Sequence, residues 1–193
     1  MYRSRKVMAI GAHPDDVEFG CSGTLCNHIK NDDYVVMVVM TNTESVDGVT
    51  GKILRTQVEN ESEARQAAEV IGCKIEFLSF KDLHVPFDFD SVSKLEGLIK
   101  KHDIDTIYTH WAGDANQDHI ATFKTTMAAA RYVPNVFCYE QIPIPRVSEN
   151  SINPTYYVDI SNTFEKKINA SECHKSQINK YESHGFNVTD NLE

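Results

Sequence analysis

Residues 7–25 read VMAIGAHPDDVEFGCSGTL, and the fold can be worked out from this stretch. An apolar run over 7–12 stops abruptly at HPDD, residues 13–16, and glycines follow closely. A short apolar run bounded by turn residues is typical of a strand buried on both faces. Two adjacent carboxylates repel each other unless a cation lies between them. The end of this strand is therefore expected to bind a positively charged group.

Strand-like and helix-like segments alternate from this stretch to the end of the chain. Strands are also expected at 34–41, 74–80, 105–110, 136–142 and 155–160. Helices are expected at 23–31, 54–72, 92–99, 118–132 and 164–181. This alternation predicts a single three-layer α/β domain over residues 1–193, with helices on both faces of a mostly parallel sheet.

Two helix ends can be placed from the type of residue found there. Gly72 stands where the helix over 54–72 should stop, since glycine readily adopts the left-handed backbone of a C-cap. Asp90 or Ser91 is expected to cap the helix over 92–99, because short polar side chains accept hydrogen bonds from the first free N–H groups.

Charge and composition argue against several classes of function. The net charge is −9 and the pI is about 5.3, which disfavours nucleic acid and anionic membranes as partners. The apolar runs at 7–12 and 34–41 are too short to span a bilayer, and no signal-peptide cleavage site follows the first, so a cytoplasmic location is expected. Five cysteines without a CxxC pair favour neither a disulfide framework nor a cysteine zinc site.

A second polar cluster, THWAGDANQDH over residues 109–119, follows a later strand. Ligands of parallel α/β sheets bind at the carboxyl ends of the strands, so the two clusters are expected to meet. Two imidazoles and one carboxylate with an open fourth position are typical of a catalytic zinc site. The candidate ligands and catalytic groups of the two clusters are His13, Asp15, Asp16, His110, Asp114, Asn116, Asp118 and His119.

A division of labour between Asp15 and Asp16 would explain their pairing. Zinc lowers the pKa of a bound water to about 7, and a nearby free carboxylate can then take up the proton of that water. One aspartate would therefore bind the metal and the other would act as the base, although spacing leaves open which does which. The alternative for HPDD is a turn in which proline sets the backbone and the aspartates cap the next segment.

The pair AHPDDVEFGCSGTL and THWAGDANQDHIAT resembles the PIG-L/LmbE family of zinc-dependent N-deacetylases. Weaker agreement extends through EARQAAEVIG and FKDLHVP to HKSQ, and so covers most of the chain. The resemblance implies a Rossmann-like fold, a zinc ion, and removal of acetyl groups from N-acetylglucosamine-type sugars or their conjugates. Such a substrate is a small molecule.

The resemblance also assigns roles to residues. His13, Asp16 and His119 match the family's zinc ligands, and Asp15 matches its general base. The implied reaction is metal-assisted amide hydrolysis, in which Asp15 takes a proton from the attacking water and returns it to the departing amine.

Asn116 departs from the family members of thiol-cofactor pathways, which carry histidine three residues before the last ligand. Other members of the wider family resemble this chain in using asparagine, so Asn116 is expected to mark a subgroup and not a loss of activity. Asparagine can donate a hydrogen bond but cannot exchange a proton. Either Asn116 donates to the oxyanion or His110 supplies the missing imidazole. Asp118 is expected to orient a neighbouring ligand, or else to cap the helix that begins there.

Three further residues are candidates for contact with the substrate. Arg55 could reach a hydroxyl or an anionic group, and its alternative is a solvated arginine at a helix start. Asp82 matches a position that the family often fills with aspartate near the site, and its alternative is a turn residue. His174 could lie at the rim of the site, and its alternative is an exposed histidine on a helix.

Other functions remain open at this stage. A zinc amidase could cleave a larger acyl group or a thiol conjugate, and a non-catalytic α/β domain could use HPDD only to shape a pocket. A nucleotide-binding Rossmann domain is disfavoured, because G-x-G-x-x-G is missing and the carboxylates would repel a pyrophosphate. A symmetric homo-oligomer is compatible with the sequence. Family members often continue past the last helix, so the chain is expected either to be truncated there or to have a site open on that side.

Overall fold

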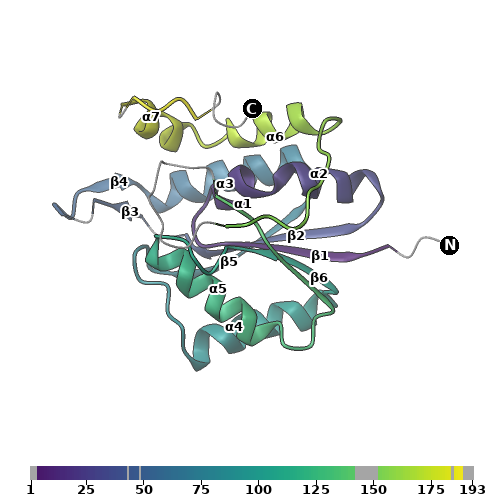
Figure 1. Ribbon diagram of the computed structural model, residues 1–193. Helices are drawn as coiled ribbons and strands as arrows, with labels where there is room; N and C mark the ends of the chain where they lie inside the picture. The colour runs from purple at the N-terminus through teal and green to yellow at the C-terminus, as the bar shows by residue number, and fades with distance from the viewer. Residues whose placement is uncertain (1–3, 43, 48, 142–151, 184, 189–193) are drawn as a thin grey trace.

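A sheet of five parallel strands lies at the centre of the computed structural model, which describes residues 4–42, 44–47, 49–141, 152–183 and 185–188 (Figure 1). The strand order is β5-β2-β1-β6-β7. The chain thus builds outward from β1 on one side and then returns to build on the other, which makes the boundary of β1 and β6 a topological switch point. The strands are β1 (Lys6–Gly11), β2 (Tyr34–Thr41), β5 (Lys74–Phe80), β6 (Thr106–Thr109) and β7 (Asn135–Cys138).

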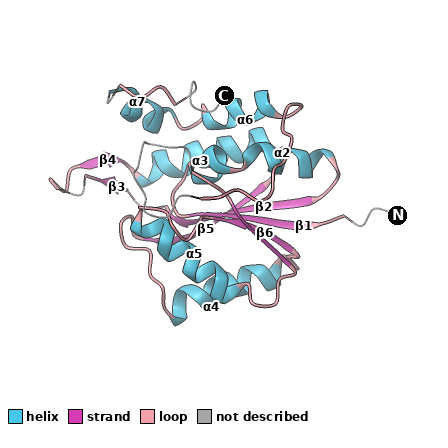
Figure 2. Ribbon diagram, viewed as in Figure 1, coloured by secondary structure: helices cyan, strands magenta, loops and turns pink. Residues whose placement is uncertain are grey.

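Helices cover both faces of the sheet (Figure 2). One face carries α1 (Asp16–Gly20), α2 (Ser22–Lys30), α3 (Gln57–Ile71) and α6 (Phe164–Ser171). The other face carries α4 (Phe89–Lys101) and α5 (Gln117–Ala129). The expected three-layer α/β architecture with a parallel sheet is confirmed.

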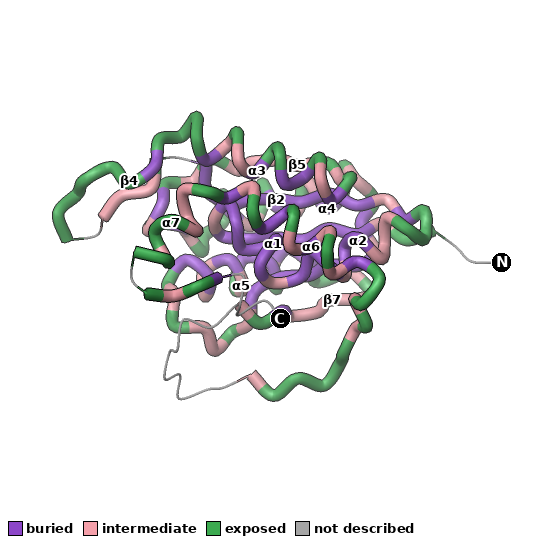
Figure 3. The backbone as a smooth tube through the Cα atoms, turned by 90° about the horizontal axis from the view of Figure 1, so that it is seen from above, coloured by how far each residue is buried: buried purple, intermediate pink, exposed green. Residues whose placement is uncertain are grey.

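The strands at the centre are buried on both sides, as their continuous apolar sequences predict (Figure 3). Val7, Ala9 and Met37 face the core under α1, α2 and α3. Met8, Ile10 and Val38 face the core that Leu95 and Ile99 of α4 close from the other side. Alternate residues of one strand therefore serve two separate cores.

Capping boxes begin α3 and α4, and one of them differs from the expectation. Thr56 and Glu59 bond reciprocally at the start of α3, and Gly72 ends that helix with φ 88°, as predicted. At α4 the cap is Asp88, so the prediction of Asp90 or Ser91 was wrong. Ser91 instead lies three residues into the helix and completes the box with Asp88.

The segment between β2 and α3 includes a short antiparallel hairpin. Its strands are β3 (Ser45–Val46) and β4 (Ile53–Arg55), and the hairpin extends away from the main sheet (Figure 1). Helix α3 consequently begins at Gln57, later than predicted.

The strand expected at 155–160 does not form. Side chains of α2 hold this part of the chain: Asn27 donates to the Asp159 carbonyl at 2.9 Å, and Lys30 donates to the Asn162 carbonyl at 3.0 Å. Gly23 permits the close approach, because a Cβ there would lie 2.8 Å from Ile160 Cδ1. The segment therefore packs against a helix by side-chain contacts instead of joining the sheet.

The helix expected over 164–181 is two helices. Helix α6 ends at Ser171 and α7 (Lys175–Ser183) begins four residues later. No helix of the described residues is long and apolar enough to cross a membrane.

Candidate active site

The carboxyl ends of β1 and β6 bring the two polar clusters together. His13 and Asp16 follow β1, and His110 follows β6. His119 lies in the first turn of α5, which begins shortly after β6. Because β1 and β6 are neighbours at the switch point, residues about a hundred positions apart in sequence share one site.

The side chains of His13, Asp16 and His119 surround one small volume, with their ligand atoms within 4.8 Å of one another. Asp16 Oδ2 lies 3.4 Å from His13 Nδ1, and Asp16 Oδ1 lies 3.3 Å from His119 Nε2. A tetrahedral zinc ion with bonds of about 2.0–2.1 Å separates its ligand atoms by roughly 3.4 Å. The spacing of these atoms therefore fits a zinc ion.

The far nitrogens of both histidines face carboxylates. His13 Nε2 lies 3.2 Å from Asp118 Oδ2 and 3.3 Å from Asp82 Oδ1. His119 Nδ1 lies 2.8 Å from Asp114 Oδ2. Histidines that bind zinc usually donate their other N–H to a carboxylate in this way, which fixes the tautomer and the ring orientation.

The charges of the cluster also fit a divalent cation. Burial alone would lower the pKa values of His13 and His119, but the surrounding carboxylates outweigh it. The pKa of His119 rises to about 9, and that of His13 rises well above its usual range. Burial would likewise raise the pKa of Asp16, yet the charge of His119, 3.3 Å away, holds it well below its usual range. The carboxylates thus favour two positive charges here, which is the charge of one zinc ion.

Asp15 is buried and has an unusual backbone. Its φ of 142° lies in a region that residues with a side chain rarely adopt, so the turn after β1 holds it under strain. Burial, followed by the charge of Asp16, raises the pKa of Asp15 to about 6. A carboxylate in this range can accept a proton and release it near neutral pH.

His110 lies behind the group of His13, Asp16 and His119. It is 0% exposed, and its ring stacks on that of His119 with centroids 4.0 Å apart. Its Nε2 lies 3.1 Å from Asp16 Oδ2, and the Ala12 N–H donates to the same nitrogen at 3.0 Å. Burial and the charge of His119 lower the pKa of His110 to about 4, so the ring is neutral at pH 7.

Asn116 and Asp118 both lie at the start of α5. Asn116 is the N-cap: its Oδ1 accepts a hydrogen bond from the Asp118 N–H at 2.8 Å. The Asp118 carboxylate instead contacts His13, and it accepts a hydrogen bond from the Val85 N–H at 3.1 Å. The geometry thus places Asp118 against a neighbouring histidine, and the cap that was its alternative role is supplied by Asn116.

The candidate substrate residues differ in their placement. Asp82 is buried and lies beside His13. Arg55 is 5% exposed, so its alternative as a solvated arginine was wrong. His174 is 0% exposed, which contradicts both the rim position and the exposed helix position. It lies between α6 and α7, with Nε2 3.1 Å from Glu18 Oε1, because the break in the helix turns it inward.

The sequence reasoning missed several residues at or near the site. Gln141 donates to Asp16 Oδ1 at 2.7 Å, and Glu63 lies 3.4 Å from Arg55 NH1. Glu18 is 1% exposed, and its position in α1, two residues after HPDD, was the available signal. The sequence contained no such signal for Gln141 and Glu63, because both look like ordinary surface residues.

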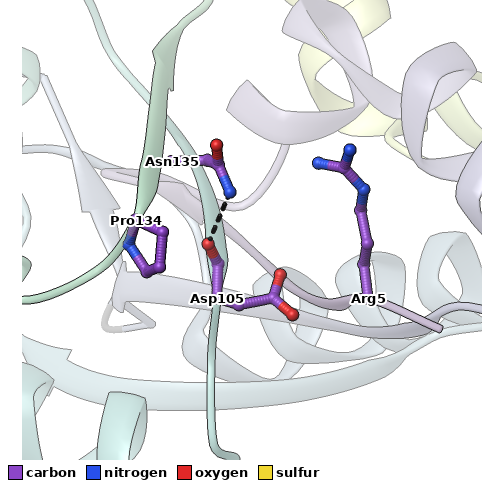
Figure 4. A pocket seen from close by; sticks show the side chains of 4 residues that line it. All are labelled: Arg5, Asp105, Pro134 and Asn135. Carbon is purple, nitrogen blue, oxygen red and sulfur yellow. Dashed lines mark hydrogen bonds between the residues drawn. The ribbon is translucent and has the colours of Figure 1, made fainter. Parts of the chain in front are cut away.

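A shallow pocket lies at the opposite, amino end of the sheet (Figure 4). Arg5, Asp105, Pro134 and Asn135 line it, each at or next to the start of a strand. Asn135 Nδ2 donates to the Asp105 carbonyl at 3.1 Å, as the dashed line shows. The pocket therefore lies away from the histidine and aspartate cluster.

Comparisons with known proteins identify the family of the chain. The model of the PIG-L family, described as GlcNAc-PI de-N-acetylase, matches residues 8–130, which include His13, Asp16 and His119. YaiS of Escherichia coli K12, described as an uncharacterized deacetylase, is 32% identical over 187 residues, covering 90% of this chain and 92% of YaiS. Diacetylchitobiose deacetylase of Thermococcus kodakarensis is 26% identical over 192 residues, covering 90% of this chain and 70% of that protein.

A solved structure shares the fold. The conserved protein TT1542 of Thermus thermophilus superposes with a TM-score of 0.79 at 20% identity, covering 97% of this chain and 84% of that one. The family model covers more than half of the chain, and the match to YaiS covers nearly all of it. The chain belongs to the PIG-L family.

Proposed function

We propose that this protein is a zinc-dependent N-deacetylase that removes the acetyl group from an N-acetylglucosamine-type sugar or sugar conjugate. The observation that carries the proposal is the group of His13, Asp16 and His119 beside the buried carboxyl group of Asp15. This arrangement offers three metal ligands and a separate proton acceptor, which amide hydrolysis requires.

His13, Asp16 and His119 would hold the metal. When bound, zinc supplies Lewis acidity, which polarises a carbonyl and lowers the pKa of water. Asp118 and Asp114 hold the far nitrogens of the two histidines and so keep the rings in the orientation that binding needs.

Asp15 moves the proton in this proposal. It takes a proton from water as the water attacks the acetamide carbonyl, and it then delivers that proton to the departing amine. Acetate and a free amino sugar result. A pKa that burial raises toward neutrality suits a group that must first accept and then donate.

Asn116 is the better candidate than His110 for stabilising the oxyanion. The Asn116 side chain is half-buried, and its oxygen is fixed by the Asp118 N–H, which leaves the NH₂ group as the donor of the amide. His110 is fully buried against Asp16 and His119, which suits a residue that holds a metal ligand in place.

The substrate class is supported by the names of the relatives. One of them is a diacetylchitobiose deacetylase, and the family model is named for an N-acetylglucosaminyl lipid. The proposed contacts to sugar hydroxyl groups are Asp82, which lies 3.3 Å from His13, and Arg55, which is buried and whose charge acts on Asp15.

Metal analysis combined with an acetate-release screen tests the proposal. After zinc reconstitution we expect one zinc ion per chain and acetate release from N-acetylglucosamine or its oligosaccharides. Asp15→Asn should keep the zinc but lower kcat by about 10²–10⁴-fold, because the proton acceptor is lost. Asp90→Asn, at an exposed position on the opposite helical layer, is the control and should behave as wild type.

Other outcomes would replace the proposal. Release of a larger acyl group in place of acetate would identify an amidase with different specificity. A protein that retains no zinc after reconstitution, or an Asp15→Asn variant with full turnover, would contradict the mechanism.

A further inference from the structure

Gln141, which follows β7, brings an amide group to the carboxylate of Asp16. Its Nε2 donates to Asp16 Oδ1 at 2.7 Å, although the two residues are 125 positions apart in sequence. The side chain is half-buried, and it takes no part in the proton transfer proposed above. The contact joins the chain beyond the edge strand β7 to the carboxylate that follows β1.

Tyr139 directs the chain between β7 and Gln141. Its hydroxyl donates to the Ile10 carbonyl at 2.9 Å, and a side chain on Gly20 would collide with its ring, so glycine is needed there. Exposure then alternates from buried Tyr139 to exposed Glu140 to half-buried Gln141, as it does along an extended chain. Gln141 therefore turns inward on the same side as Tyr139.

The two oxygens of Asp16 are held by different parts of the chain. Oδ2 accepts a hydrogen bond from the His13 N–H at 2.7 Å and lies 3.1 Å from His110 Nε2. Oδ1 lies 2.7 Å from Gln141 Nε2 and 3.3 Å from His119 Nε2. The carboxyl group therefore cannot rotate without breaking a contact at one oxygen or the other.

Metal binding would remove one of the two contacts at Oδ1. A histidine nitrogen that binds a metal carries no proton, so it cannot donate a hydrogen bond. His119 Nε2 would then no longer donate to Asp16 Oδ1, and Gln141 would be the remaining donor to this oxygen among the residues that the structure describes. The orientation of Oδ1 in the metal-bound protein would thus depend on Gln141.

We propose that Gln141 is a positioning residue that holds Asp16 Oδ1 in the orientation that binds zinc, and so sets the zinc affinity of the site. This inference rests on the metal ligands of the proposed function. Loss of a hydrogen-bond partner of a metal ligand weakens metal binding by about 10–100-fold in other proteins. An amide suits this place, because it donates a hydrogen bond without adding a positive charge that would repel the metal ion.

The test measures the dissociation constant of zinc by competition with a chelating dye, starting from metal-free proteins. Gln141→Met keeps the length of the side chain but loses the donor, and Gln141→Ala loses both. Each variant should bind zinc about tenfold more weakly than the wild type. Gln66→Met is the matched control and should bind zinc as the wild type does, because the amide of Gln66 is exposed on α3 and donates only to Ser62 of the same helix.

Unfolding in urea separates positioning from a general loss of structure. Without zinc, the unfolding midpoint of Gln141→Met should equal that of the wild type, because water can replace the amide of a half-buried side chain. With the same concentration of added zinc, the midpoint should rise less for Gln141→Met than for the wild type, because a ligand stabilises a protein according to its dissociation constant.

Turnover shows whether Gln141 acts through zinc or contacts the substrate. At saturating zinc, Gln141→Met should release acetate from N-acetylglucosamine with kcat and KM within about twofold of the wild type, because the metal site is then filled. At a free zinc concentration equal to the wild-type dissociation constant, a tenfold weaker site is filled about fivefold less, and acetate release should be slower by the same factor.

Three results would overturn the inference. These are equal zinc dissociation constants for Gln141→Met and the wild type, weaker zinc binding in Gln141→Ala but not in Gln141→Met, and a raised KM at saturating zinc, which would identify a substrate contact instead. If Gln141→Met binds zinc more weakly but the wild type releases no acetate, the inference stands and the proposed function fails. If the wild type releases acetate and Gln141→Met binds zinc equally well, the proposed function stands and the inference fails.

Discussion

At the amino end of the sheet, aspartates fix the starts of strands, whereas at the carboxyl end they gather imidazoles. Asp105 accepts hydrogen bonds from the Lys6 N–H at 3.2 Å and the Thr106 hydroxyl at 2.8 Å. Asp33 accepts one from the Arg5 N–H at 2.7 Å and lies 2.7 Å from His28 Nδ1. His28 also contacts the Tyr108 hydroxyl through Nε2, so both of its nitrogens are engaged there.

At the carboxyl end, Asp16 also accepts one backbone hydrogen bond, from the His13 N–H at 2.7 Å. Beyond that, the nitrogens of three histidines lie within 3.4 Å of its two oxygens. One carboxylate surrounded by three imidazoles is a poor way to fix a loop but a suitable start for a metal site. The comparison teaches that convergence of ligand atoms on one volume, and not the presence of aspartate and histidine, distinguishes a site from a structural pair.

The largest effect should come from removing the negative charge of Asp16 at the carboxyl end of the sheet. Asp16→Asn takes away a ligand that all three histidines face, so we expect zinc affinity to fall at least 100-fold and deacetylation to be lost. Zinc content after dialysis and acetate release measure the two effects. Asp105→Asn, at the amino end, should keep both properties. An Asp16→Asn variant that retains zinc would show that the histidines alone hold the metal.

The next effect should come from the buried pair of Glu18 and His174 beneath the site. Both side chains are almost completely buried. Burial alone would lower the pKa of His174, but the negative charges of Glu18 and Asp15 outweigh burial, so the pKa of His174 is raised. His174→Ala would leave Glu18 buried without its partner, so the free energy of unfolding should fall by about 3 kcal/mol. Urea denaturation of the metal-free protein measures this fall.

A double variant separates the pair from simple loss of packing. Glu18→Gln combined with His174→Ala should recover part of the stability, because no unpaired charge then remains in the interior. A double variant less stable than the sum of the two single changes would contradict this explanation.

The sequence predicted the architecture because its signals are local and repeated. The strands over 34–41 and 74–80 could be predicted from their apolar residues alone, and the end of α3 from Gly72 alone. The same reasoning wrongly predicted a strand over 155–160, because contacts with α2, including Gly23, determine the path of this segment. No alternation of residue types within a segment can reveal what lies beside it.

The sequence predicted which residues meet at the site, but not how deeply each of them is buried. That His13 and His119 would share one site followed from parallel strands. That His110 is buried behind Asp16 did not follow, because a histidine at a strand end can turn either way. His174 was harder still, since the break between α6 and α7 contains neither glycine nor proline. Burial of a single side chain depends on contacts distant in sequence, which spacing does not contain.

The smallest effect should come from the amino end, where Asp105 fixes backbone and does no chemistry. Asp105→Ala removes the acceptor of the Lys6 N–H and of the Thr106 hydroxyl, so the free energy of unfolding should fall by about 1–2 kcal/mol. The zinc content and the kinetic constants should remain those of wild type, because β1 is also held by its pairing with β2 from Lys6 to Gly11 and with β6 from Val7 to Ala9. Denaturant unfolding and acetate release, measured on the same preparation, check both parts. A fall in kcat of the variant under conditions where it is fully folded would mean that the amino end of β1 controls the position of HPDD. The two ends of the sheet would then not be independent.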